Sequence, residues 1–137
     1  MTTRNVELVS RYFDCINHQD WDGVAEVTIP ELSTAVRDFL WRPHPDLRIE
    51  VEWMAPHDDR VSVWCYASGT HQNPWELPPS MGSLAGGKLE PSGKSWRMAG
   101  AATYRVADDR IADVWAVWDW LGLLTQLGVV ELRTGAS

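Results

Sequence analysis

The N-terminal third of the chain repeats its apolar positions at helical spacing. The apolar residues of the first segment lie three or four positions apart: Val6, Val9, Phe13 and Ile16. This spacing predicts an amphipathic helix. Asp20 is a suitable N-cap for a second short helix, and Ser33 or Thr34 can cap a third helix that ends at Pro43. We therefore expect three helices before any strand.

From Leu47 onward the spacing of the apolar residues changes from helical to alternating, which predicts strands. Four segments are expected as strands: residues 47–53, 60–71, 95–106 and 111–118. The short polar turn at residues 107–110 makes the last two strands a hairpin. Helices that precede a run of strands favour an α+β fold with a curved antiparallel sheet over a parallel α/β fold. A final apolar repeat over residues 121–127 predicts a C-terminal helix.

Residues 72–94 follow neither pattern. Proline and glycine crowd into this segment: Pro74, Pro78, Pro79, Gly82, Gly86, Gly87, Pro91 and Gly93. A loop of this length without regular structure is unusual in a compact domain and is often functional. We expect a long loop here that can act as a lid over a pocket.

The size and composition of the chain limit its class. At 137 residues the chain fits a single domain, residues 1–137, that needs no metal or disulfide to hold its core. The formal net charge of −7 disfavours a nucleic-acid partner, because such proteins usually present a basic face. Cys15 and Cys65 lie in apolar segments without CxxC spacing, as expected in a reducing compartment. Without a signal-like or membrane-length apolar run, we expect a cytoplasmic protein with no membrane partner.

Motifs for nucleotide, metal or Schiff-base chemistry do not fit the sequence. Residues 82–89 have the spacing of a phosphate-binding loop, but Leu89 stands where a Ser or Thr should hold Mg²⁺. The four histidines share no metal-ligand spacing with each other or with the cysteines. Lys88 and Lys94 lie in or beside the irregular segment, whereas a Schiff-base lysine needs a desolvated place on a rigid element. We therefore expect neither a metal nor a cofactor.

Tryptophan is unusually frequent, with nine residues in the chain. Buried Trp needs a partner for its N–H, so ordinary cores use Leu or Phe more readily. A wall of Trp suits a flat aromatic or polyene-like ligand, but Trp is also enriched in dimer interfaces. Four residues are expected to line a substrate or to lie at such an interface: Trp64, Trp96, Trp115 and Trp118.

Asp119 is the strongest single candidate for chemistry. It lies between Trp118 and Trp120, after a strand on which Trp115, Val117 and Asp119 share a face. If that face lines a pocket, desolvation raises the pKa of the carboxyl toward the range useful to a general acid or base. Because the last helix begins directly after it, Asp119 can equally be an N-cap. Periodicity does not decide between these two roles.

The stretch that contains Asp119 resembles the C-terminal signature of the SnoaL-like polyketide cyclases, which belong to the nuclear-transport-factor-two-like superfamily. This stretch reads Trp118-Asp119-Trp120-Leu121-Gly122-Leu123-Leu124-Thr125-Gln126-Leu127-Gly128. Further pieces of the resemblance follow in order: Tyr12-Phe13, Asp20 to Val24, Pro45-Asp46-Leu47, Gly69-Thr70-His71, Tyr104-Arg105-Val106 and Arg110-Ile111. The resemblance covers most of the chain, and the C-terminal motif is fairly specific for the family but not for one reaction.

The resemblance implies a cone-shaped fold in which a strongly bent sheet wraps the helices around a deep apolar pocket, and a homodimer formed by the outer face of the sheet. Family cyclases close a ring by intramolecular aldol addition without metal or cofactor. The family aspartate that maps onto Asp119 serves as acid and base. We therefore expect a cyclase or isomerase for a hydrophobic or aromatic polyketide-like substrate, of the kind used in antibiotic biosynthesis.

Two departures from the family pattern affect the expected pocket. The family has a strand and a polar loop between the second and third helices, but residues 27–33 are too short for both. A family histidine on the third strand maps onto Ala102, and Gly100 and Ala102 make that strand small, which enlarges the pocket. His71 is then the remaining acid–base partner or a turn histidine, and Tyr104 is an oxyanion donor or a core aromatic residue.

Two other functions stay open. An epoxide hydrolase or ether-ring-forming cyclase on the same fold usually needs two acids in one pocket, and Asp113 is the other acid on the strand face of Asp119. A non-catalytic small-molecule-binding protein would use the same pocket without turnover. The short segment and the absent histidine favour this second alternative.

Overall fold

The computed structural model describes residues 2–77, 87–131, 133 and 135. Helical segments come first: α1 (Thr2–Asn17), α2 (Trp21–Val27), α3 (Pro30–Ala35) and the π-helix η1 (Val36–Trp41). The strands follow: β1 (Arg48–His57), β2 (Arg60–Thr70), β3 (Trp75–Glu76), β4 (Lys88–Leu89), β5 (Ser95–Ala107) and β6 (Arg110–Trp118). The last helix is α4 (Trp120–Gln126). None of the described helices is long and apolar enough to cross a membrane.

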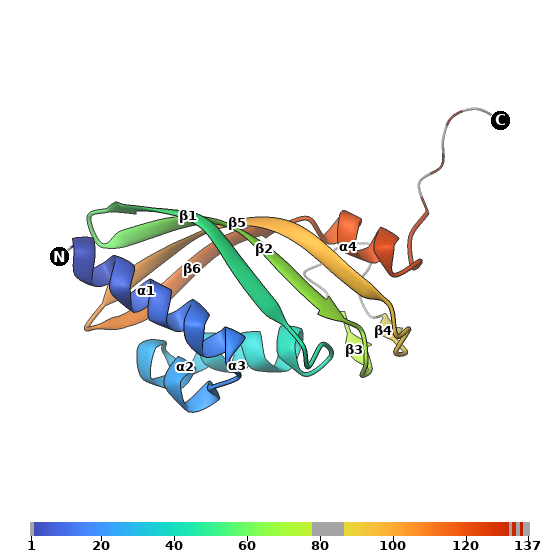
Figure 1. Cartoon of the computed structure of the whole chain (residues 1–137), viewed down its shortest axis with the longest axis horizontal. Helices are drawn as coiled ribbons and strands as arrows, with labels where there is room; N and C mark the ends of the chain where they lie inside the picture. The colour runs from blue at the N-terminus through green and yellow to red at the C-terminus, as the bar shows by residue number, and fades with distance from the viewer. Residues whose placement is uncertain (1, 78–86, 132, 134, 136–137) are drawn as a thin grey trace.

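Four long strands form one antiparallel sheet in the order β1-β2-β5-β6, which confirms the predicted α+β fold. The strand pairing shifts register between Val51 and Trp53 and between Arg105 and Val106. Irregularities of this kind bend a strand and increase its twist. Figure 1 shows the sheet arching over α1, α2 and α3, which lie beneath one face, with α4 at one end.

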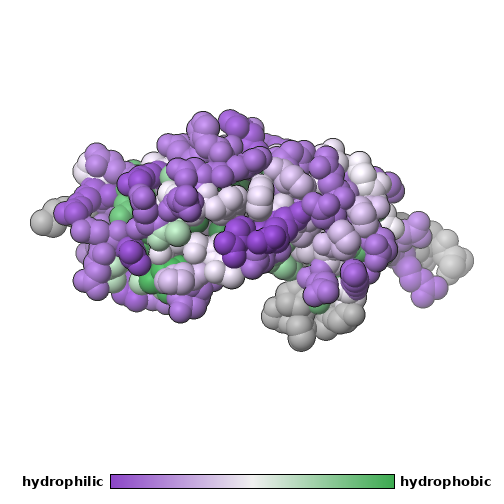
Figure 2. Space-filling view, turned by 90° about the horizontal axis from the view of Figure 1, so that it is seen from below, coloured by the Kyte–Doolittle hydropathy of each residue, from purple (hydrophilic) through white to green (hydrophobic). Residues whose placement is uncertain are grey.

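The inner face of the sheet packs against α1. Buried residues alternate along the central strands: Val61, Val63, Cys65 and Ala67 on β2, and Trp96, Met98, Gly100, Ala102 and Tyr104 on β5. From α1, the rings of Tyr12 and Phe13 lie 5.5 and 5.6 Å from that of Tyr104 between centroids. The surface seen from below the view of Figure 1 is mainly hydrophilic (Figure 2), as the amphipathic pattern predicts.

The third predicted helix begins earlier than the sequence suggested. Pro30 occupies its first turn, where a missing N–H costs nothing and the fixed φ suits a helix, so neither Ser33 nor Thr34 caps it. The helix then widens into η1, with the N–H of Arg42 donating to the carbonyl of Arg37 at 2.9 Å. π-helical turns are rare and often lie at functional sites.

The short connection at residues 27–33 forms a single bridge to the sheet, at the place where the resemblance implied a strand. Thr28 is fully buried and pairs with Ile111 of β6, and the N–H of Ile29 donates to the Ile111 carbonyl at 3.1 Å. The hydroxyl of Thr28 donates to the carbonyl of Val24 at 2.7 Å. This connection therefore packs directly on the edge of β6.

The segment predicted as one long loop contains a small ladder. β3 and β4 pair antiparallel through Trp75–Leu89 and Glu76–Lys88. The N–H groups of Gln72 and Asn73 both donate to the carbonyl of Pro43, at 3.0 and 3.2 Å, so this segment is attached to the end of η1. The middle of the predicted lid, residues 78–86, lies outside the described residues.

Candidate functional site

Asp119 lies where β6 ends and α4 begins. Its N–H donates to the carbonyl of Ala99 at 3.0 Å, which fixes this junction to β5. Its Oδ1 accepts a hydrogen bond from the N–H of Gly122 at 2.9 Å, so Asp119 is the N-cap of α4. The side chain is exposed, and no hydrogen bond to its Oδ2 occurs among the described residues. The capping role therefore uses one carboxylate oxygen and leaves the other available.

Two indole rings flank Asp119. The half-buried Trp118 lies over Gly100 of β5, where a Cβ would collide with its ring. The small residues of β5 therefore make room for Trp118 and do not enlarge a pocket there, contrary to the expectation from the sequence. On the other side, the ring of Trp120 packs against Phe39 and Trp75, with centroids 5.7 and 6.1 Å apart.

Next to Trp120 lies a group of buried rings that we call the His–Trp cluster. Its members are His44, His71, Trp75 and Trp96. The His44 ring lies 4.6 Å from that of Trp75, 4.9 Å from that of Trp96 and 5.6 Å from that of His71 between centroids. Gly69 permits this approach, because a Cβ there would lie only 3.0 Å from the Cβ of His44.

The two histidines of the cluster are held by different hydrogen bonds. The Nδ1 of His44 lies 2.8 Å from the carbonyl oxygen of Leu40, and the Nδ1 of His71 lies 3.3 Å from the N–H of Ser92. The pKa of His44 is lowered to about 4, chiefly by burial and in smaller part by His71, against the raising effects of the Leu40 carbonyl and Asp46. Burial also lowers the pKa of His71, partly offset by the backbone of Asn73. Both imidazoles are therefore neutral at pH 7.

Four nitrogens of the cluster are buried and have no hydrogen-bond partner among the described residues. They are Nε2 of His44, Nε2 of His71, Nε1 of Trp75 and Nε1 of Trp96. A buried polar group without a partner costs about 1–3 kcal/mol, so four in one place indicate more than core packing.

Tyr104 lies apart from this group. It is buried against Tyr12 and Phe13, and burial raises the pKa of its hydroxyl well above the usual range, with Tyr12 and Cys65 raising it further. The hydroxyl is therefore neutral and able to donate. Since β5 advances roughly 3.3 Å per residue, the five steps from Ala99 put Tyr104 roughly 16 Å along the strand from the Asp119 junction. The structure does not bring Tyr104 and Asp119 to the same reacting atoms.

Trp64 and Trp115 lie on the outer face of the sheet. Trp115 pairs across strands with Thr103, whose hydroxyl is bonded to that of Ser62 at 2.9 Å, and the Arg60 guanidinium lies 4.8 Å from the Trp115 ring centroid. Alternation places Trp64 on this face too, opposite the buried residues of β2. Neither tryptophan faces the His–Trp cluster.

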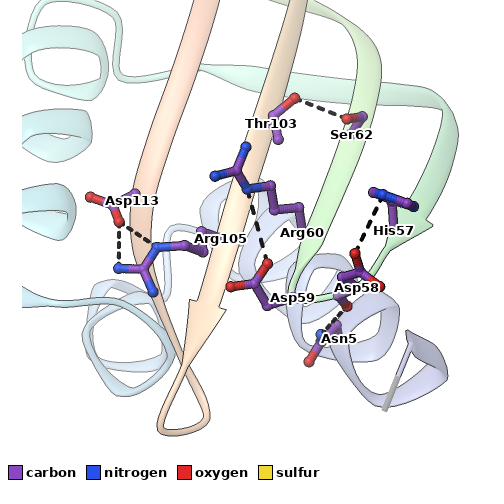
Figure 3. Close-up of polar contacts among 9 residues, drawn as sticks. All are labelled: Asn5, His57, Asp58, Asp59, Arg60, Ser62, Thr103, Arg105 and Asp113. Carbon is purple, nitrogen blue, oxygen red and sulfur yellow. Dashed lines mark hydrogen bonds and ion pairs between the residues drawn. The ribbon is translucent and has the colours of Figure 1, made fainter.

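Asp113 also lies on the outer face. Its Oδ2 accepts a hydrogen bond from Nε of Arg105 at 2.6 Å, and Figure 3 shows this pair beside Arg60 and Thr103. It therefore does not share a pocket with Asp119 as the second acid of the epoxide alternative.

A surface groove of about 420 Å³ opens beside the His–Trp cluster. It is lined by Asp38, Phe39, Arg42, Pro43, Pro74, Trp75, Glu76 and Lys88. Trp75 belongs both to this groove and to the cluster, so one ring separates the groove from His44. No group of three metal-ligating side chains occurs among the described residues.

Sequence reasoning missed His44 and Trp75. His44 stands between Pro43 and Pro45, where the third predicted helix ends, and was considered only as one of four histidines without metal-ligand spacing; Trp75 lies in the irregular segment. The available signal was a large aromatic ring and an imidazole in stretches that were otherwise interpreted as surface loop, since loops seldom carry such residues without a packing or binding role.

Comparison with known proteins agrees with this fold. The profile of the SnoaL-like polyketide cyclases matches residues 31–127. AclR of Streptomyces galilaeus, described as a candidate hydroxylase, is 20% identical with a TM-score of 0.73, over 96% of this chain and 100% of that one. IdmH of Streptomyces antibioticus, described as a candidate polyketide cyclase, is 22% identical with a TM-score of 0.68, over 91% of this chain and 99% of that one. A candidate SnoaL-like polyketide cyclase from Jannaschia is 23% identical with a TM-score of 0.74, over 95% of each chain.

No curated protein matches the chain significantly. The bent antiparallel sheet over N-terminal helices defines an α+β protein with the fold of these solved structures. With the profile match over residues 31–127, the chain belongs to the SnoaL-like polyketide cyclase family.

Proposed function

We propose that the protein is a cofactor-independent cyclase or isomerase that closes a ring in a polyketide-like intermediate, with Asp119 as acid and base. One observation carries this proposal. Asp119 is held in place by its own helix cap, through Oδ1, while Oδ2 is unpaired among the described residues, and its neighbours in the chain are Trp118 and Trp120.

The proposed reaction is an intramolecular aldol addition. Asp119 removes a proton from an acidic carbon between two carbonyl groups, and the carbanion forms a bond to a second carbonyl carbon within the same molecule. The proton on the Asp119 carboxyl then passes to the new alkoxide, so the reaction needs no further reactant. In this proposal a flat substrate lies against Trp118 and Trp120 and covers the exposed carboxylate.

The other predicted catalytic residues take more distant roles in this proposal. His71 is separated from Trp120 by Trp75, so it acts on the part of the substrate that reaches the His–Trp cluster. Tyr104 remains a proposed hydrogen-bond donor only for the far end of an extended molecule. Of the predicted substrate-binding residues, Trp118 and Trp96 face inward, and Gly100 and Ala102 are buried on the same face of the sheet.

The experiment compares binding with turnover for wild type and Asp119→Asn. Binding is measured by calorimetry with a cyclisable aromatic poly-β-ketone, and ring closure is followed by mass-resolved chromatography. We expect the variant to bind the ketone within about threefold of wild type and to lose ring closure by about 10²-fold or more. Tight binding without turnover in both proteins would instead indicate a binding protein. Unchanged turnover in the variant would remove Asp119 from the mechanism.

We also propose that the outer face of the sheet pairs two copies of the chain. Three large apolar residues lie exposed there: Trp53, Trp115 and Val117. They line a groove of about 580 Å³ together with the hydroxyl pair Ser62–Thr103. Apolar surface concentrated in this way on a sheet is typical of an interface.

A further inference from the structure

Gln126, in the last turn of α4, binds the backbone of β5 with both ends of its side-chain amide. Its Nε2 donates to the carbonyl of Arg97 at 2.8 Å, and its Oε1 accepts from the N–H of Arg97 at 2.9 Å. The same Nε2 also donates to the carbonyl of Gly122, one turn earlier in the helix, at 3.0 Å. The amide has two N–H donors and one carbonyl acceptor, and all three are therefore in use.

The backbone of Arg97 takes this partner because the neighbouring strand has ended. β6 pairs with β5 until the chain turns into α4 at Asp119, whose N–H donates to the carbonyl of Ala99 at 3.0 Å. Alternate residues of an antiparallel strand direct both backbone groups to the same neighbour, so Arg97 faces the same side as Ala99. The amide of Gln126 thus stands where the next peptide of β6 would have paired.

These contacts also connect Gln126 to Asp119. Gly122 is held from both sides, because its carbonyl accepts from Gln126 and its N–H donates to Oδ1 of Asp119 at 2.9 Å. Arg97 is itself anchored, with its guanidinium carbon 3.9 Å from the ring centroid of Tyr66 on β2. Helix α4 is therefore attached to β5 at two points, the N–H of Asp119 and the amide of Gln126. At roughly 1.5 Å per residue these points lie roughly 10 Å apart along the helix, which prevents α4 from pivoting about Asp119.

We propose that Gln126 is a positioning residue for Asp119, whose amide holds α4 on β5 and thereby fixes the direction of the Asp119 carboxylate. A general base must lie within hydrogen-bond reach of the proton that it removes, and a misplacement of about 1 Å can cost about 10²-fold in rate. Gln126 acts only through Asp119 in this scheme. Its effect on the rate rests on the proposed function, whereas the attachment of α4 needs no reaction.

The test is a substitution that removes the amide and keeps the length of the side chain, Gln126→Met. The matched control is Asn17→Leu, because Asn17 makes the same pair of bonds with the backbone of Ile49, at 2.8 and 2.7 Å, on the edge strand β1 at the other side of the sheet. For closure of the aromatic poly-β-ketone, we expect Gln126→Met to lower kcat by about tenfold and to leave KM within about twofold. Asn17→Leu should leave both values within about twofold of wild type.

A double substitution separates positioning of Asp119 from a general loss of structure. Because Gln126 acts through Asp119, Gln126→Met should change the residual rate of an Asp119→Asn protein by less than about twofold. A general loss of structure would lower the rate alike in both backgrounds. Equal losses in the two backgrounds, or equal losses of kcat in Gln126→Met and Asn17→Leu, would overturn the positioning role.

Amide hydrogen exchange in the protein without substrate tests the attachment apart from any reaction. The N–H of Gly122, which is bonded to Asp119, should exchange about tenfold faster in Gln126→Met and at the wild-type rate in Asn17→Leu. Unchanged exchange in Gln126→Met would overturn the attachment. A wild-type protein without turnover would instead contradict the proposed function, and the exchange of Gly122 would still decide whether Gln126 holds this turn.

Discussion

At the scale of single residues, the side chains that matter most are polar groups placed among apolar rings. His44 is fully buried, is bonded through Nδ1 to Leu40, and has a pKa lowered to about 4 chiefly by burial. An unfolded chain would protonate this histidine near pH 6.5. The folded protein therefore binds fewer protons at this position than the unfolded chain does between pH 6.5 and pH 4.

This difference predicts a loss of stability in acid. Because the folded pKa lies below the unfolded pKa, the His44 contribution is retained above pH 6.5 and lost as the pH falls toward 4, by about 3 kcal/mol for a difference of 2.5 pKa units. Urea unfolding at pH 7 and pH 5 measures the part that is lost between these two values, about 2 kcal/mol. His44→Phe should flatten the dependence between these two pH values. An equally steep dependence in this variant would show that His44 is not the group responsible.

The sequence indicated which residues are candidates for function better than it indicated what surrounds them in the fold. It indicated Asp119 from a motif and correctly kept an N-cap role open, because helix starts have a readable local pattern. It could not show that Trp115 faces outward while Trp118 faces inward. That assignment depends on which face of the strand is buried, and a strand with apolar residues on both faces does not reveal it. His44 was missed because its burial comes from contacts with β3 and β5, far along the chain.

At the scale of elements, periodicity located the helices and strands because most of them have one buried face. β1 continues to His57, beyond its predicted end near residue 53, because backbone pairing with β2 persists where burial stops. Pro56 is tolerated in it because β1 is an edge strand of the sheet. The hairpin turn at residues 107–110 was predicted correctly, and Asp108 and Asp109 adopt the positive φ angles that such turns need.

The pairing of Gly100 with Trp118 gives an element-scale prediction. Gly→Ala within a strand ordinarily improves stability slightly, because glycine loses more conformational freedom on folding. At Gly100 the new Cβ would meet the Trp118 ring, so Gly100→Ala should lower the free energy of unfolding by about 1–3 kcal/mol in urea titrations. The same change made in a Trp118→Leu protein should cost clearly less. Equal costs in the two backgrounds would show that the ring does not fill this space.

Helices α2 and α4 give a second prediction, because their first turns are alike. Asp20 accepts from the N–H of Gly23, and Asp119 accepts from that of Gly122, each through Oδ1 at 2.9 Å. Asp20→Ala and Asp119→Ala should each reduce stability by about 1 kcal/mol, whereas the Asn variants should stay near wild type, since Asn caps as well as Asp. Thermal unfolding of the four variants measures this. A cost confined to one helix would contradict the equivalence of the two caps.

At the scale of the whole molecule, the bent sheet separates two kinds of surface. Its inner face is closed by α1 and by the His–Trp cluster, and its outer face exposes Trp53, Trp115 and Val117. The resemblance to known cyclases predicted the bent sheet correctly, because the order of helices and strands is specific for this fold. The pocket volume was not predictable, because it depends on where individual rings such as Trp118 lie.

The proposed pairing through the outer face of the sheet predicts that a charged substitution on this face lowers the mass of the protein in solution. Val117 is 75% exposed in the groove of the proposed contact, so Val117→Asp should turn a dimer into a monomer by placing a charge in an apolar interface. Light scattering coupled to gel filtration measures the mass. Val129→Asp, also at an exposed apolar residue but outside this groove, should leave the dimer intact. A wild-type monomer, or a dimer that persists in Val117→Asp, would contradict the pairing.

The central claim concerns Asp119 as the acid and base of a ring closure, and the chain contains its own control. Asp20 has the same cap geometry at the start of α2, followed like Asp119 by a tryptophan. The most direct measurement is kcat for closure of an aromatic poly-β-ketone by Asp119→Asn and Asp20→Asn. The account predicts a loss of about 10²-fold or more for Asp119→Asn and a rate within about twofold of wild type for Asp20→Asn. Equal rates in the two variants would mean that Asp119 is a helix cap only.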